Sequence, residues 1–239
     1  MKLKTRFALS AVSLLLAGAF TAPDARGAVT YTSGHADIGV AYEDGAFDLH
    51  FHSEGGVIDG VETNGEYAPG DVIIRADSAN LTLPMDFPAL GKVSGETIWV
   101  LPWTQEEGLP FLGLASEELN PDDWDSSGIT FTITQATCLG DPAASFAMWR
   151  YDVFGGIILD ASSLTGPSSI STTTGGHDHF NFGFSTPGAW DVTFTVTGTN
   201  NSDGPVSATG TFRFDVVPEP SSALLGVLGT GLLVLRRRR

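Results

Sequence analysis

The chain has 239 residues, of which 42% are hydrophobic, and its 28 acidic and 12 basic residues give a formal net charge of −16. The ordinary apolar fraction excludes wholesale disorder, and the single cysteine, Cys138, excludes an internal disulfide or a thiolate metal cluster within one chain. Residues 28–217 hold 26 acidic and four basic residues, a net charge of −22 that would repel phosphates, so no nucleic-acid partner is expected.

Residues 1–27 are typical of a secretory signal peptide. The first six residues contain three basic side chains, and Phe7–Phe20 is a short apolar run. Ala25-Arg26-Gly27 is a suitable cleavage site, with Ala17-Gly18-Ala19 as an alternative. Because 14 residues are short for a membrane-spanning helix, we expect cleavage and export rather than an uncleaved anchor.

Residues 28–216 are expected to form one all-β domain, because apolar and polar residues alternate between turns rich in Gly, Pro, Asn and Asp. Many short strands with regular turn signals favour an Ig-like or jelly-roll-type β-sandwich, either one elaborated sandwich or a sandwich with a small appended unit. Glu43-Asp44-Gly45 predicts a tight hairpin, Ala115–Asn120 a short helical turn at most, and Ser162–Gly176 a long loop. The predicted strands are Ile38–Tyr42, Ala46–His52, Asp71–Arg75, Thr97–Leu101, Ile129–Thr137, Ser145–Val153, His179–Phe184, Trp190–Thr197 and Thr209–Val216.

The histidines fall in three short segments of this domain. Two histidines that are two residues apart on a strand point to the same face, with Cβ atoms about 7 Å apart, so both rings can reach one cation. Neutral imidazoles and carboxylates suit Zn²⁺, Cu²⁺ or Ni²⁺. We therefore predict a transition-metal site, with zinc or copper as the expected ion; hydrogen-bonded surface histidines are the alternative. The candidate ligands are His35, Asp48, His50, His52, His177 and His179.

Residues 217–239 combine a proline motif, an apolar run and a basic end. Ser221–Leu235 would cover roughly 22 Å as a helix, which is short against a hydrocarbon core of about 30 Å, so we expect one short transmembrane helix. The basic end should stay in the cytoplasm and leave residues 28–216 outside. The motif residues are Pro218, Glu219 and Pro220, and the basic end is Arg236, Arg237, Arg238 and Arg239.

These three parts, in this order, resemble the PEP-CTERM sorting signal. The resemblance implies a Gram-negative bacterium that makes exopolysaccharide, with an exosortase-type processing enzyme as partner. It also implies insertion in the inner membrane through the C-terminal helix, followed by anchoring or by release to the cell surface or extracellular matrix. A plain C-terminal anchor is the alternative.

Two histidine segments carry a second resemblance, which extends over residues 29–216. The stretch 177–199, HDHFNFGFSTPGAWDVTFTVTGT, and the stretch 34–40 followed by Leu49-His50-Phe51-His52 are similar to actinobacterial surface-anchored repeats. These belong to the choice-of-anchor M domain proteins, although Phe182 and Trp190 stand where Trp and Tyr are expected. The resemblance implies a noncatalytic surface domain; some relatives are associated with metal-type ABC transporters.

We therefore expect a signal peptide (1–27), a β-sandwich surface domain (28–216) and a sorting and anchor segment (217–239). The expected function is that of an exported, noncatalytic surface protein that binds a transition metal through its histidines. The alternative is an exopolysaccharide- or calcium-associated matrix or adhesion module, which the sorting signal and the acidic charge suggest. A hydrolase is disfavoured, because the sequence has no Gly-x-Ser-x-Gly nucleophile motif.

Overall fold

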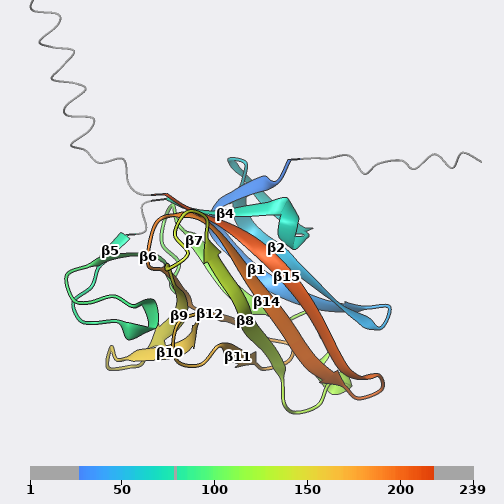
Figure 1. The fold of residues 1–239 in the computed structure, drawn as a ribbon. Coiled ribbons are helices and arrows are strands. Elements are labelled where there is room, and N and C mark those ends of the chain that lie inside the picture. Colours follow the sequence, from blue (N-terminus) through green and yellow to red (C-terminus); the bar gives the residue numbers. More distant parts are fainter. Residues whose placement is uncertain (1–26, 78–79, 218–239) are drawn as a thin grey trace, which may run out of the picture.

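The computed structural model describes residues 27–77 and 80–217, which form an almost entirely β structure. The expected signal peptide lies outside the described residues except for its last position, and the sorting and anchor segment lies outside except for Val217. Among the described residues, no helix has the length and apolar character needed to cross a membrane. Figure 1 shows β14, β15, β1 and β2 as long strands crossing the molecule, with β5, β6, β9 and β10 gathered at one side.

Within those residues the chain forms fifteen strands and three short 3₁₀ helices. The strands are β1 (Val29–Glu43), β2 (Ala46–Ile58), β3 (Val61–Tyr67), β4 (Val72–Asp77), β5 (Asn80–Thr82), β6 (Thr97–Leu101), β7 (Pro110–Ala115), β8 (Ile129–Cys138), β9 (Phe146–Tyr151), β10 (Ile157–Ser162), β11 (Ser169–Thr172), β12 (His177–His179), β13 (Asn181–Phe184), β14 (Gly188–Asn200) and β15 (Gly204–Val217). The 3₁₀ helices are η1 (Pro69–Asp71), η2 (Pro88–Leu90) and η3 (Pro121–Asp123).

In the larger sheet, β1 pairs with three other strands, β2, β4 and β7. The strand order of this sheet is β11-β8-β14-β15-β4-β1-β2-β3, while β7 pairs with β1 and β12 pairs with β7. The first residues of β1 pair in parallel with β4, and Gly34–Gly39 pair in parallel with β7. The two halves of this sheet meet through their apolar faces. A Cβ built at Gly210 of β15 would come within 2.9 Å of the Leu49 side chain of β2.

A phenylalanine-rich core fills the space between these layers. Ile38 of β1, Leu112 of β7, Phe194 of β14 and Phe212 of β15 are all fully buried. Truncating a buried Phe to Ala usually lowers the free energy of unfolding by about 3–5 kcal/mol. This core therefore gives β1 and β7 a rigid support on their inward face. The smaller sheet, β10-β9-β13-β6-β5, has a second, smaller core around Trp149.

The all-β, sandwich-like class and most predicted strands are confirmed. The Glu43-Asp44-Gly45 hairpin is also confirmed: Glu43 pairs with Ala46, and Asp44 and Gly45 have φ values of 51° and 84°, as a type I′ turn requires. The predicted Ser162–Gly176 loop is wrong in part, because β11 lies within it. Ala115–Asn120 forms no helix.

The predicted strand His179–Phe184 is also wrong as one unit. The chain leaves the larger sheet after His179 and enters the smaller sheet at Asn181. Phe180, between the two strands, is fully buried. This crossing places His177 and His179 at the edge of the larger sheet, beside β7 and close to β1.

Candidate metal centre

All five histidines lie on or beside one polar face of four neighbouring strands, in the order β2, β1, β7, β12. This face is opposite the core, because Ala36, Ile38 and Val40 of β1 point inward. Two rows of cross-strand partners run over it. They are His52, Asp37, Gly113 and His179 in one row, and His50, Gly39, Ala115 and His177 in the next.

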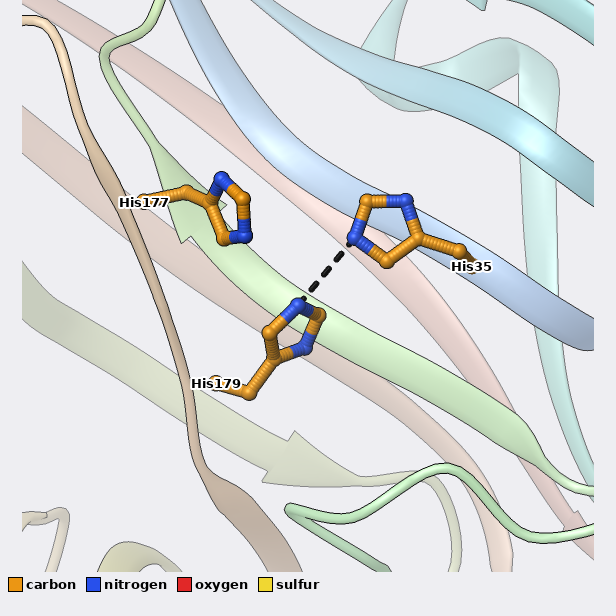
Figure 2. A group of neighbouring side chains, drawn as sticks. All are labelled: His35, His177 and His179. Atoms are coloured by element: carbon orange, nitrogen blue, oxygen red, sulfur yellow. Dashed lines mark hydrogen bonds between the residues drawn. The ribbon is translucent and has the colours of Figure 1, made fainter.

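Three of the histidines, His35, His177 and His179, form what we call the three-histidine group. One ring nitrogen from each residue lies within 4.8 Å of the corresponding nitrogens of the other two. Nε2 of His35 is 3.1 Å from Nε2 of His179. Figure 2 shows the three rings pointing toward one another, His35 from one side and the two β12 residues from the other.

Neighbouring side chains hold the rings of this group in place. The ring of Phe111 stacks on His179 with centroids 3.6 Å apart and an interplanar angle of 7°. Glu117 Oε1 lies 2.5 Å from Nδ1 of His177, and Glu54 Oε2 lies 3.6 Å from Nδ1 of His35. Carboxylates placed on the far nitrogen of an imidazole are typical of metal sites, since they fix the ring and make its other nitrogen a better ligand.

Asp37 is a buried carboxylate at the floor of the group. Asp37 is 3% exposed, and its Oδ1 atom is buried without a hydrogen-bond partner. Oδ2 lies 3.5 Å from Nε2 of His35. Burial raises the pKa of Asp37 to about 6, although the charges of His35 and His177 oppose the shift. Gly113 makes room for this arrangement, because a Cβ there would overlap Asp37 Oδ1 and approach the His179 ring to 3.2 Å.

The pKa values of the two β12 histidines shift in opposite directions. Burial and the neighbouring charge of His35 lower the pKa of His179 to about 4, so this ring is neutral at physiological pH. Burial also lowers the pKa of His177, but the hydrogen bond to Glu117 and the nearby charges of Asp37, Glu117 and Asp178 outweigh it and raise the pKa overall. The fold therefore keeps the His179 ring neutral and able to coordinate a metal, whereas it stabilises the protonated form of His177.

The remaining two histidines form a second set with Glu118, which we call the two-histidine group. Glu118 Oε1 lies 2.9 Å from Nε2 of His50 and 3.4 Å from Nδ1 of His52. The three ligand atoms all lie within 4.8 Å of one another. His50 is buried, His52 is half-buried and Glu118 is exposed.

This face is rich in carboxylates and poor in basic side chains. Asp37, Glu54, Glu117 and Glu118 all approach histidine rings. In the part of the chain that the structure describes, no lysine or arginine forms an ion pair with any of these four acids. Bound cations would supply the missing positive charge.

The structure brings His35 together with His177 and His179, and it brings His50 together with His52. Asp48 belongs to neither group: its side chain is exposed, and its backbone oxygen lies 3.3 Å from Nδ1 of His50. The sequence analysis did not predict four acids that approach the rings. One of them could have been predicted: Asp37 is two residues from His35, and the same spacing from His50 led to the prediction of Asp48. The missed residues are Asp37, Glu54, Glu117 and Glu118.

The three-histidine group has the chemistry of a transition-metal site. Two nitrogens bound to a tetrahedral Zn²⁺, each at about 2.0–2.1 Å, are about 3.3–3.4 Å apart. The observed separation of 3.1 Å between His35 and His179 is close to this value.

No protein-family model, curated protein or solved structure matches this chain.

Proposed function

We propose that this chain binds a transition-metal ion, Zn²⁺ or Cu²⁺, at the three-histidine group. The observation that carries the proposal is the convergence of ring nitrogens from residues 144 positions apart, His35 and His179, with His177 beside them. Neutral imidazoles are good ligands for zinc and copper, whereas calcium and magnesium prefer oxygen.

Asp37 supports a cation over a simple hydrogen-bonded cluster. Asp37 is a buried carboxylate whose Oδ1 has no hydrogen-bond partner and whose Oδ2 lies 3.5 Å from Nε2 of His35, and a cation beside the His35 ring would offset the cost of burying this charge. Three imidazoles would provide three neutral ligands, a number that suits zinc with its fourth position open, and the negative charge of Asp37 would lie beside the His35 ring. Glu54 and Glu117 would then remain on the far nitrogens of His35 and His177.

The test is thermal unfolding of the purified full chain, in mild detergent and with an affinity tag that contains no histidine. The protein is stripped with EDTA and then given Zn²⁺, Cu²⁺ or Ca²⁺. An ion that binds only the folded state raises the melting temperature, and an excess of 100 times Kd contributes about 2.7 kcal/mol. We expect Zn²⁺ and Cu²⁺ to stabilise the wild type and Ca²⁺ not to do so.

The variant for this test is His177→Ala/His179→Ala, and the matched surface control is Glu107→Gln. Glu107 is exposed in the turn before β7 and has no part in either histidine group. The control should respond to metal as the wild type does, whereas the double variant should lose the tighter part of the response. Equal responses from the double variant and the wild type would refute the three-histidine site.

For the whole chain we propose an exported, noncatalytic surface protein with an Ig-like or jelly-roll-type sandwich, sorted by an exosortase-type enzyme through Pro218-Glu219-Pro220. The sequence pattern of residues 1–27 and 217–239 supports this proposal. Replacing the three motif residues with Ala should leave a longer, membrane-retained form in cell fractions. An unchanged size and location would count against sorting.

An exopolysaccharide- or calcium-associated matrix role is the alternative. A rise in melting temperature with Ca²⁺ or a glycan, in the thermal unfolding assay described above, would favour it.

A further inference from the structure

We propose that the two-histidine group is a second metal site, so that each chain holds two transition-metal ions side by side on the face formed by β2, β1, β7 and β12. This inference extends the proposed function from one ion to a pair. It does not require the first site to be correct, because its ligands are different residues.

The ligand atoms of the two-histidine group already surround a small space. Glu118 Oε1 is 2.9 Å from Nε2 of His50 and 3.4 Å from Nδ1 of His52. These separations resemble the edges of about 3.3 Å expected between ligands of a tetrahedral zinc ion. Two histidines and one glutamate also form a recognised zinc ligand set, in which the fourth position is open to water or another ligand.

The fold builds this site around His50. The residue is 3% exposed, and the backbone oxygen of Asp48 lies 3.3 Å from its Nδ1, so Nε2 is turned toward Glu118. Its cross-strand partner is Gly39, where a Cβ would lie 2.9 Å from Nε2 of His50. Asp48 would thus contribute to metal binding through its main chain, which orients the ring, and not through its carboxylate.

The two groups differ in their ligands and in what supports them. The three-histidine group has Phe111 stacked on one ring and the buried carboxylate of Asp37 beneath it. The two-histidine group offers two imidazoles and one exposed carboxylate, and among the described residues it has neither a stacked aromatic ring from outside the group nor a buried acid like Asp37 against it. We therefore expect the second ion to bind more weakly and to exchange faster than the first.

Glu54 connects the two groups. Its Oε2 lies 3.6 Å from Nδ1 of His35, and its Oε1 lies 3.8 Å from Nε2 of His52. Two dications on neighbouring strands repel each other, and a carboxylate between their ligands offsets part of that repulsion. Glu54→Gln should therefore weaken the second binding step more than the first, a coupling that would vanish if only one ion bound.

The experiment counts ions with Co²⁺ as the probe, since Co²⁺ takes the ligands of zinc and gives visible absorption. The full chain and its variants are titrated with Co²⁺, and bound metal is measured by elemental analysis after equilibrium dialysis against a known concentration of free Co²⁺. We expect two equivalents for the wild type and for Glu107→Gln. His50→Ala/His52→Ala and His177→Ala/His179→Ala should each bind one.

The variants separate failure of this inference from failure of the proposed function. One equivalent in the wild type, kept by His50→Ala/His52→Ala and lost by His177→Ala/His179→Ala, would overturn the second site alone. The reverse pattern would overturn the three-histidine site alone. Loss of all binding in both double variants would indicate one shared ion and overturn the pair, and no binding to the wild type would overturn both sites.

A second variant guards against misfolding of the histidine mutants. Glu118→Gln removes the charged ligand from an exposed position in a turn and leaves both strands intact. It should keep the wild-type circular dichroism and bind one tight equivalent, with the second weakened at least tenfold. Two equivalents of unchanged affinity in this variant would contradict the assignment of Glu118 as a ligand.

Discussion

Glu117 and Glu118 are consecutive in the chain, yet they contact different histidine groups. Glu117 Oε1 lies 2.5 Å from Nδ1 of His177, and Glu118 Oε1 lies 2.9 Å from Nε2 of His50. The turn that carries them is fixed by Ser116, whose N–H donates to the Gly176 carbonyl at 2.9 Å. A single short turn after β7 therefore supplies a carboxylate to each group.

Gly113→Ala should disable the three-histidine group. The new methyl would overlap Asp37 Oδ1 and lie 3.2 Å from the His179 ring, so one of these side chains must move. We expect Zn²⁺ binding at this site to weaken at least tenfold, which isothermal titration calorimetry would detect. Gly65→Ala in β3 is the matched control, because its Cβ meets ordinary contacts of 3.8 Å; equal losses in both variants would contradict the prediction.

Gly39→Ala should act on the two-histidine group and spare the other. Its methyl would stand 2.9 Å from Nε2 of His50 and push that ring away from Glu118. Elemental analysis should find one tight Co²⁺ equivalent in place of two. Retention of the second equivalent would mean that His50 Nε2 is not a ligand.

Asp37→Asn should change how stability depends on pH in the metal-free protein. The pKa of Asp37 is raised from 3.8 to about 6 by burial, so between these values the folded state binds a proton that the unfolded state has released. This group therefore makes the wild type less stable as pH rises from about 4 to about 6, by up to about 3 kcal/mol. The variant lacks this contribution and should gain stability relative to the wild type over that window.

Urea unfolding of both proteins at pH 4, 5, 6 and 7, after removal of metal, would measure this difference. His179 has the opposite sign, because its pKa is lowered to about 4 and the unfolded state binds the extra proton above that pH. Its contribution is present in both proteins and should largely cancel in the comparison. A difference in unfolding free energy that stays constant across the four pH values would contradict the raised pKa of Asp37.

Glu117→Gln should lower the pKa of His177. The hydrogen bond and the charge of Glu117 both favour the protonated ring, and burial, the largest single influence, opposes them. NMR titration of the histidine ring protons would follow the change, with Glu107→Gln as the control. An unchanged His177 titration would show that the nearby charges of Asp37 and Asp178 alone maintain the shift.

The sequence predicted the fold class well because the alternating pattern is strong where a strand has one face in the core, as in β8 and β14. The prediction missed β3, β5, β7, β10 and β11. Two of these have weak patterns: β3 is largely polar with no buried residue, and β7 is a short apolar run with little alternation. Missing β7 also hid how the histidine segments meet, because β7 is the strand that joins β1 to β12.

The candidate site was predictable only in its local part. The spacing of His50 and His52, and of His177 and His179, placed each pair on one face, as the strands confirm. The pairing of His35 with β12 depends on long-range strand register, and Glu118 comes from a turn with no signal of its own. Asp48 and Glu118 are both acidic, and only the three-dimensional position of the turn distinguishes them.

The parallel pairing of β1 with β7 also has a consequence for kinetics. Gly34 must find Pro110, and His177 must then reach Ala115, before either histidine group is complete. Pairings between such distant parts of a chain usually form late, so a bound ion should contribute little to the rate of folding. It should instead slow unfolding, so that wherever proteases attack the unfolded chain the supply of metal would set how long each molecule survives.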